Sequence, residues 1–179
     1  MPFPVFAWGV LGVNLFVILW GALVRATGSG AGCGRHWPLC NGQVLPQSPA
    51  TNTLIEFTHR ATSGVALLLV IALWWWSRRA FPAGHRARRA ALWSLGLIVV
   101  EALIGAGLVL FELVENDDSL FRVAYLSGHL LNTFVLLGAL ALTAWWARDT
   151  APWREPARGA APWLLGAGLA GLLLTAPMS

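Results

Sequence analysis

Two histidines and two glutamates lie inside long apolar stretches of the chain, where ionisable side chains are costly and usually mark function. They are Glu56, His59, Glu101 and His129. A histidine pair can bind a metal or a haem iron, and a nearby carboxylate can transfer protons or stabilise positive charge. The simpler alternative for any one histidine is a core residue satisfied by a hydroxyl or a carbonyl. The position of these residues in their helices distinguishes a metal or haem ligand from a core histidine.

The only two cysteines, Cys33 and Cys40, lie in the segment CGRHWPLC. Gly34 and Pro38 favour turns, so the six residues between the thiols can close a small ring. A disulfide is the leading interpretation. A zinc site that includes His36 is the alternative, although three candidate ligands fall one short of a closed structural site. The CxxCH motif of a c-type haem is absent.

Apolar segments long enough to cross a bilayer carry most of these residues. Hydrophobic residues make up 57% of the chain and charged residues only 11%, which is typical of an integral membrane protein and not of a soluble domain. Four segments approach or exceed the roughly 20 residues that a spanning helix needs. They are 6–24, 54–76, 90–113 and 123–146. We therefore predict an all-α integral membrane protein built on a four-helix transmembrane bundle.

A fifth apolar segment, 163–176, is shorter than the other four. We expect 162–179 to form a short or truncated fifth C-terminal hydrophobic helix, which either spans the membrane or lies at its surface. The predicted organisation is thus a four-helix domain over 1–146, with a long loop at 25–53, followed by a second loop at 147–161 and the fifth helix.

The arginines indicate how the bundle is oriented, because basic residues favour the cytoplasmic side of a membrane. Arginines are concentrated in 78–89 and 148–158, whereas the turn at 112–118 is acidic. We predict a plasma-membrane protein with a cytoplasmic N-terminus and a cytoplasmic 147–161 loop. The cysteine loop then lies outside, where oxidising conditions permit a disulfide. The net charge of +4 reports this topology, and no nucleic-acid partner is expected.

His59 and His129 fall at the same predicted depth. They lie five and six residues from the outer ends of their helices, about 8 to 9 Å at 1.5 Å per residue. Because those two helices run in the same direction, facing imidazoles can reach both axial positions of one haem iron. The matched depth favours this use over two unrelated core histidines. Asn132 and Thr133, one turn beyond His129, can bond a ligand edge or join helices.

Glu56 lies three residues before His59, so both side chains share one helix face. It is either an acid or base above a haem, or the last residue of a capping box that begins at Thr53. The sequence does not choose between these roles. Arg60 can extend its charge to the outer surface. Arg60 and Arg25 are both candidates to pair with the carboxylates of haem propionates.

Glu101 is the deepest charge in the predicted bundle. It is either a proton-relay group or a neutral acid hydrogen-bonded to Asn14 or Asn132. His85, between arginines in the second loop, is expected to be a solvated residue.

Several of these stretches together resemble the haem A synthase family. The segment GALVRATGSGAGCGRHWPLCNG, followed by IEFTHR, is similar to that family's first outer loop and second helix. The segments EALIGAGLVLF and SGHLLNTFVLL are similar to its third and fourth helices. The resemblance extends over residues 5–146, and the combination of a cysteine loop with Glu-x-x-His-Arg is specific for a short motif.

The resemblance implies a membrane oxidoreductase that oxidises a ring methyl of haem O to the formyl group of haem A for cytochrome oxidase assembly. It implies that His59 and His129 are axial ligands of a haem iron and that Glu56 is the required acid. It also implies that a disulfide between Cys33 and Cys40 holds the outer loop over the haem. The bound group would be haem b, substrate haem O, or both.

The main departure from the family is length, because its typical members have two similar four-helix halves and this chain resembles the N-terminal half. A half-length enzyme that works as a homo-oligomer is one interpretation, and a truncated product that binds haem without completing the chemistry is another. The alternative function is a non-catalytic bis-histidine b-type cytochrome or a haem-handling assembly protein. The blandest alternative is a scaffold whose histidines bind nothing. Expected partners are the bilayer, a haem O synthase and cytochrome oxidase assembly proteins.

Overall fold

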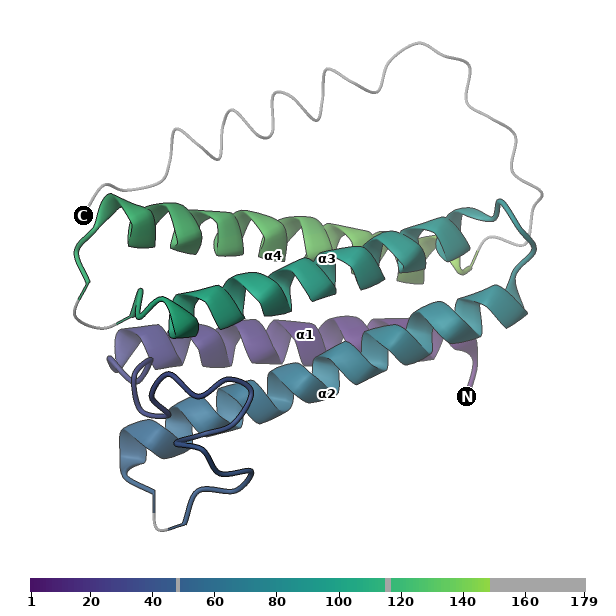
Figure 1. Ribbon diagram of the computed structural model, residues 1–179. Coiled ribbons are helices and arrows are strands. Elements are labelled where there is room, and N and C mark those ends of the chain that lie inside the picture. The colour runs from purple at the N-terminus through teal and green to yellow at the C-terminus, as the bar shows by residue number, and fades with distance from the viewer. Residues whose placement is uncertain (48, 115–116, 149–179) are drawn as a thin grey trace.

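The computed structural model describes residues 1–47, 49–114 and 117–148, and these form four long helices (Figure 1). The helices are α1 (Phe3–Ala26), α2 (Thr51–Ala80), α3 (Arg86–Leu110) and α4 (Leu120–Trp146). Each is long and apolar enough to cross a membrane, so the prediction of an all-α, multi-pass membrane protein is confirmed. The predicted fifth helix and nearly all of the 147–161 loop lie outside the described residues.

Helices α3 and α4 begin before their predicted apolar segments, and in each a side chain caps the first turn. Ser119 begins α4, where its hydroxyl accepts the backbone N–H of Arg122 at 3.1 Å. His85 begins α3 in the same way, because its Nδ1 accepts the N–H of Ala87 at 3.2 Å. Its ring also stacks on Phe81 with centroids 4.4 Å apart. The prediction that His85 is merely a solvated side chain was therefore wrong.

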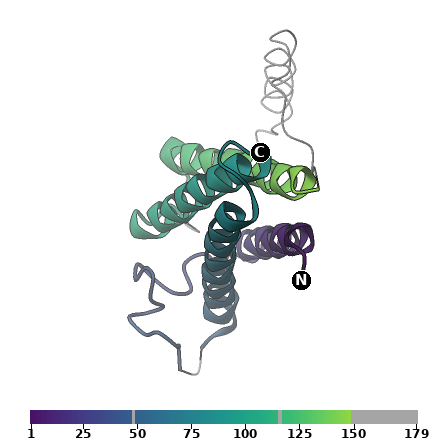
Figure 2. The same ribbon diagram turned by 90° about the vertical axis from the view of Figure 1, so that its right-hand side faces the viewer.

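The four helices form a ring in which each packs against two neighbours. Contacts join α1 to α2, α2 to α3, α3 to α4 and α4 to α1, and among the described residues the backbones of α2 and α4 do not approach each other. Figure 2 shows α1 and α2 on one side of the bundle and α3 and α4 on the other. The helices that carry His59 and His129 are therefore opposite corners of the ring, with their side chains free to point toward a shared interior.

The apolar core occupies one half of the bundle. Its buried members lie in the first part of α1 and α3 and in the last part of α2 and α4, which is the end away from the cysteine loop. They are Phe3, Ala7, Val10, Ala66, Val70, Leu73, Ala87, Ile98, Leu136, Leu140, Ala144 and Ala147. The other half holds the ionisable residues that the sequence singled out. The bundle therefore combines an apolar anchor with a polar half beneath the loop.

Candidate functional site

The loop between α1 and α2 is closed by a disulfide between Cys33 and Cys40, whose side chains are buried. The backbone N–H of Asn41 bonds the carbonyl of Cys33 at 2.9 Å, which closes the ring a second time. Gly34 and Asn41 have positive φ, as the tight turn requires. The disulfide interpretation fits this loop. The zinc alternative does not, because both thiols are consumed and the described residues contain no cluster of three ligand-type side chains.

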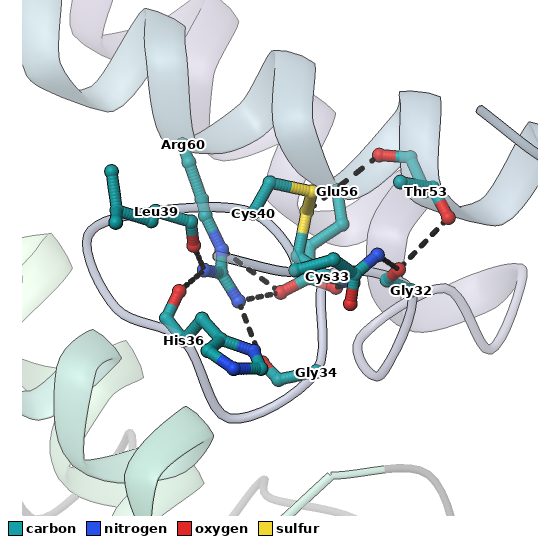
Figure 3. Close-up of polar contacts among 10 residues, drawn as sticks. Gly32, Cys33, Gly34, His36, Leu39, Cys40, Thr53, Glu56 and Arg60 are labelled. Atoms are coloured by element: carbon teal, nitrogen blue, oxygen red, sulfur yellow. Dashed lines mark hydrogen bonds and ion pairs between the residues drawn. A yellow bond between two sulfur atoms is a disulfide. The ribbon is translucent and has the colours of Figure 1, made fainter. Parts of the chain in front are cut away.

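Glu56 ties this ring to α2 (Figure 3). Its Oε2 accepts the backbone N–H of Cys33 at 2.7 Å, and its Oε1 is paired with the guanidinium of Arg60. The capping-box interpretation was wrong. The helix begins at Thr51, and the hydroxyl of Thr53 donates to the carbonyl of Gly32 at 2.8 Å instead of capping the helix. Glu56 is 3% exposed and faces the loop with both oxygens.

Arg60 holds the loop from the same helix face. Its Nη1 donates to the carbonyls of His36 and Leu39, both at 2.7 Å, and its Nη2 reaches the carbonyl of Gly34. Together with the pair to Glu56, these bonds use all five N–H groups of the guanidinium. The side chain reaches the loop, as expected for an arginine that extends to the surface. These bonds tie Arg60 to the loop, whereas Arg25 is exposed at the end of α1.

His59 lies against α1 at a glycine. A Cβ on Gly21 would come within 2.9 Å of Cε1 and 3.3 Å of Nε2 of His59, so only glycine leaves room for the ring. Nδ1 of His59 is buried and has no hydrogen-bond partner. The neighbouring hydroxyl of Ser63 donates to the backbone carbonyl of His59 at 2.7 Å and not to the ring. Because a buried imidazole nitrogen is rarely left unpaired, this side chain fits a residue that awaits a ligand.

His129 contacts Glu101. Its Nδ1 lies 3.0 Å from Oε1 of the carboxylate, although the N–H direction is not aligned for a straight hydrogen bond. The same carboxylate accepts from the amide of Asn132 and the hydroxyl of Thr133. The expected bond from Glu101 to Asn132 is thus confirmed. The alternative bond to Asn14 is not formed, because the Asn14 amide donates to the carbonyl of Val10 in its own helix at 2.9 Å.

Sequence reasoning missed the contact between Glu101 and His129, and a signal for it was present. His129, Asn132 and Thr133 are spaced at i, i+3 and i+4, so they share one face of α4. Helices α3 and α4 are sequential and antiparallel. A carboxylate on α3 at matching depth therefore meets that face.

The two histidines lie on opposite corners of the ring of helices, and Glu101 contacts the one on α4. All three lie in the polar half, on the side of the disulfide loop. The ring of His59 occupies the space that a Cβ on Gly21 would fill.

Comparison with known proteins shows the family to which the chain belongs. The family model described as cytochrome oxidase assembly protein, COX15-CtaA, matches residues 4–178. The chain belongs to this family. The resemblance to haem A synthases that the cysteine loop and the helices suggested is thereby confirmed.

Relatives within the family differ in their names and lengths. A protein of Thermus thermophilus named "Protoheme IX farnesyltransferase" is 55% identical over 168 residues, which are 94% of this chain and 28% of that protein. The "Heme A synthase" of Shouchella clausii is 48% identical over 101 residues, 56% of this chain and 33% of the relative. The "Heme A synthase" of Halalkalibacterium halodurans is 40% identical over 129 residues, 71% and 42% of the two chains. No solved structure matches the chain.

The COX15-CtaA chain therefore spans between 28% and 42% of the length of these relatives. Haem is the group that the family uses, and the residues present fit it. Two imidazoles on opposing helices suit the two axial positions of a haem iron. The carboxylate of Glu101 behind His129 matches the acid that commonly supports a ligating histidine through its second ring nitrogen.

Proposed function

We propose that this chain binds haem between His59 and His129 and oxidises a ring methyl of haem O to the formyl group of haem A. The observation that carries the proposal is the pair of half-buried imidazoles on opposite corners of the bundle, beneath a loop tied down by Glu56. Membership of the COX15-CtaA family supports it. A scaffold whose histidines bind nothing would not need a buried, partnerless Nδ1 on His59.

The residues of the chain would divide the work of binding. His59 and His129 would hold the iron, and haem when bound supplies the redox chemistry at its own ring. Arg25 would pair with a propionate, since it is exposed at the loop end of α1 and its side chain makes no hydrogen bond or ion pair within the described part of the chain. Converting the methyl to a formyl group takes one oxygen atom from water and releases four electrons and four protons, so a water molecule and an external electron acceptor are both required.

Glu56 would serve the reaction by holding the outer loop closed over the haem. The resemblance implies a direct acid role beside the iron, and such a role needs an oxygen that faces the interior. Both oxygens face the loop, where they accept Cys33 N–H and pair with Arg60. A closed loop would limit the access of bulk water to the site, so that only the water needed for the oxidation reaches the methyl carbon and side reactions are reduced.

The substrate would come from a protohaem farnesylation reaction. Haem O is the farnesylated derivative of protohaem IX, and a Thermus thermophilus protein named for that farnesylation contains a 168-residue region that is 55% identical to this chain. We propose that haem O passes from such an enzyme to this one within the plasma membrane, for use by cytochrome oxidase assembly. The N-terminus would be cytoplasmic and the disulfide loop outside, as the arginine distribution favours.

Association of two copies would supply a second histidine pair. We propose that two four-helix units, each with its own histidine pair, act together as a homo-oligomer.

A second candidate function is a non-catalytic b-type cytochrome or a haem-handling assembly protein that uses the same two histidines. The observation that favours it is the place of the two histidines on opposite corners of the bundle, which suits two axial ligands whether the haem is a substrate or a permanent cofactor. Haem binding by itself supports both functions, so the product must distinguish them.

Haem content and haem type of the purified protein test the proposal. Protein from cells that supply haem O should carry a bis-imidazole haem spectrum and yield haem A on extraction. His59→Ala and His129→Ala should each abolish that spectrum, whereas His85→Asn, which keeps a good cap at the far end of the bundle, should not. Bound haem without any haem A would favour the b-type cytochrome. A preparation with no histidine-dependent haem would exclude both functions.

A further inference from the structure

We infer that Glu101 is a positioning residue for His129, which fixes the ring with Nδ1–H toward the carboxylate and leaves Nε2 for the iron. The inference rests on the proposed haem site. It assigns a role to the deepest carboxylate of the bundle, which is not itself a candidate iron ligand. It also predicts that the two axial histidines are not equivalent.

Geometry is the first support. Oε1 of Glu101 lies 3.0 Å from Nδ1 of His129, and the carboxylate is fixed from two further directions by Asn132 and Thr133. The Asn132 amide also donates to the carbonyl of Leu97 at 2.9 Å, which ties α4 to α3 at this level. A carboxylate held at several points can impose one orientation on a ring, whereas a freely rotating one cannot.

Charge is the second support. Every other partner of the Glu101 carboxylate in the described part of the chain is a neutral donor, so His129 is its only ionisable contact there. An acid in this position is costly in a membrane helix unless it has a partner. The hydrogen bond from a ligating histidine to a carboxylate selects the tautomer and makes the ligand more basic.

The contrast with His59 is the third support. Neither Nδ1 makes a straight hydrogen bond, but in the described residues only that of His129 lies beside a carboxylate, and the hydroxyls near His59 are committed to backbone carbonyls. Thr62 donates to Thr58 at 2.8 Å, and Ser63 donates to His59 itself at 2.7 Å. Within the described residues, the Glu101 carboxylate therefore supports the histidine of α4 and not that of α2. A more basic imidazole on α4 should stabilise ferric over ferrous iron.

The first experiment needs no haem. Nitrogen-15 NMR of histidine-labelled, haem-free protein reads which ring nitrogen carries the proton. His129, assigned by its loss in His129→Ala, should be the Nδ1–H tautomer in the wild type and a mixture or the other tautomer in Glu101→Leu. A wild-type His129 with its proton on Nε2, or a tautomer unchanged in Glu101→Leu, would overturn the inference.

The second experiment measures haem b affinity and midpoint potential in reconstituted protein. Glu101→Leu removes the acceptor and should weaken haem binding roughly 10–100-fold. Glu101→Gln keeps an acceptor of the same shape without the charge, so it should retain haem. The ratio of its affinities for ferric and ferrous haem should fall about tenfold. That change is a positive shift of about 59 mV for a one-electron couple. Glu112→Gln is the matched control, since Glu112 is exposed and pairs only with Arg35 in the described residues.

The outcomes separate the inference from the proposed function. Wild-type potential and affinity in both Glu101 variants would reject the positioning role and leave the histidine site intact. A positive shift in Glu101→Gln without haem A production in the wild type would support the positioning role and reject the enzyme. Where the wild type binds no haem, the proposed function fails and the NMR tautomer still decides the role of Glu101. Glu101→Gln, which preserves shape, gives the answer if Glu101→Leu does not fold.

Discussion

The backbone N–H of Cys33 donates a 2.7 Å hydrogen bond to Oε2 of Glu56, so the disulfide ring is attached directly to the helix that carries His59. A carboxylate three residues before a candidate iron ligand thereby controls the position of the outer loop. Glu56 is therefore linked both to the disulfide ring and to the helix of the proposed haem site. This relationship also makes the loop and the site experimentally separable.

Weakening the bond between Glu56 and the loop should expose the disulfide. In Glu56→Gln the amide can still accept Cys33 N–H, but its NH₂ replaces the oxygen that pairs with Arg60. Losing a charged partner at a buried site costs about 1–3 kcal/mol, so reduction of the disulfide should be roughly tenfold faster or more. Thiol labelling after timed exposure to a mild reductant measures this rate. Glu112→Gln, which breaks only an exposed pair, should leave it unchanged.

The same variant distinguishes two roles for Glu56. If haem A production falls together with disulfide protection, and the wild-type level of bound haem remains, the loop role is supported. If haem A production is lost while the disulfide stays as protected as in the wild type, the carboxylate acts chemically on the substrate.

A methyl group at Gly21 should disturb the haem site through His59. The new Cβ would lie 2.9 Å from Cε1 of the imidazole, closer than atoms pack without a shift. Forcing a rigid ring to move costs about 1–3 kcal/mol in a packed interior, so Gly21→Ala should weaken haem binding roughly tenfold. Haem titration followed by absorbance measures the effect. Gly12→Ala on the same helix meets no atom within 4 Å and should bind haem normally.

Removing the disulfide should destabilise the loop more than the bundle. Closing an eight-residue ring stabilises a chain by roughly 2–3 kcal/mol if the effect is entropic. The double substitution Cys33→Ser and Cys40→Ser should therefore lower the resistance of the 27–50 loop to proteolysis while the four helices remain folded. Limited proteolysis and circular dichroism of the same sample report the two effects. Loss of helicity would instead show that the bundle depends on the staple.

Orientation in the membrane can be tested with two introduced cysteines. Asp118→Cys lies in the acidic turn between α3 and α4, and Ala83→Cys lies between α2 and α3 at the opposite end. If the N-terminus is cytoplasmic, a membrane-impermeant maleimide should label position 118 in intact cells and position 83 only after permeabilisation. The reverse pattern would place the disulfide loop inside.

Arg60 and Glu101 show which contacts the sequence predicts and which it does not. That Arg60 would extend to the outer surface followed from its position near a helix end, but its acceptors in the loop did not, because they are carbonyls 21 to 26 residues away. The sequence left open whether Glu101 bonds Asn14 or Asn132, and the structure forms the bond to Asn132. The contact of Glu101 with His129 depends on the rotation of α3 against α4, which hydropathy does not encode.

The sequence by itself determined the four long helices of the described residues, their approximate bounds and their capacity to cross a membrane, and it proposed His59 and His129 as candidate ligands. These follow from local quantities: apolar length sets a spanning helix, and an ionisable residue within it is conspicuous because its burial is costly. Only the tertiary structure decided what Glu56, Arg60 and Glu101 contact. Hydrogen-bond partners between helices and loops depend on distances of a few tenths of an ångström between residues far apart in the chain, and those distances exist only once the four helices have packed.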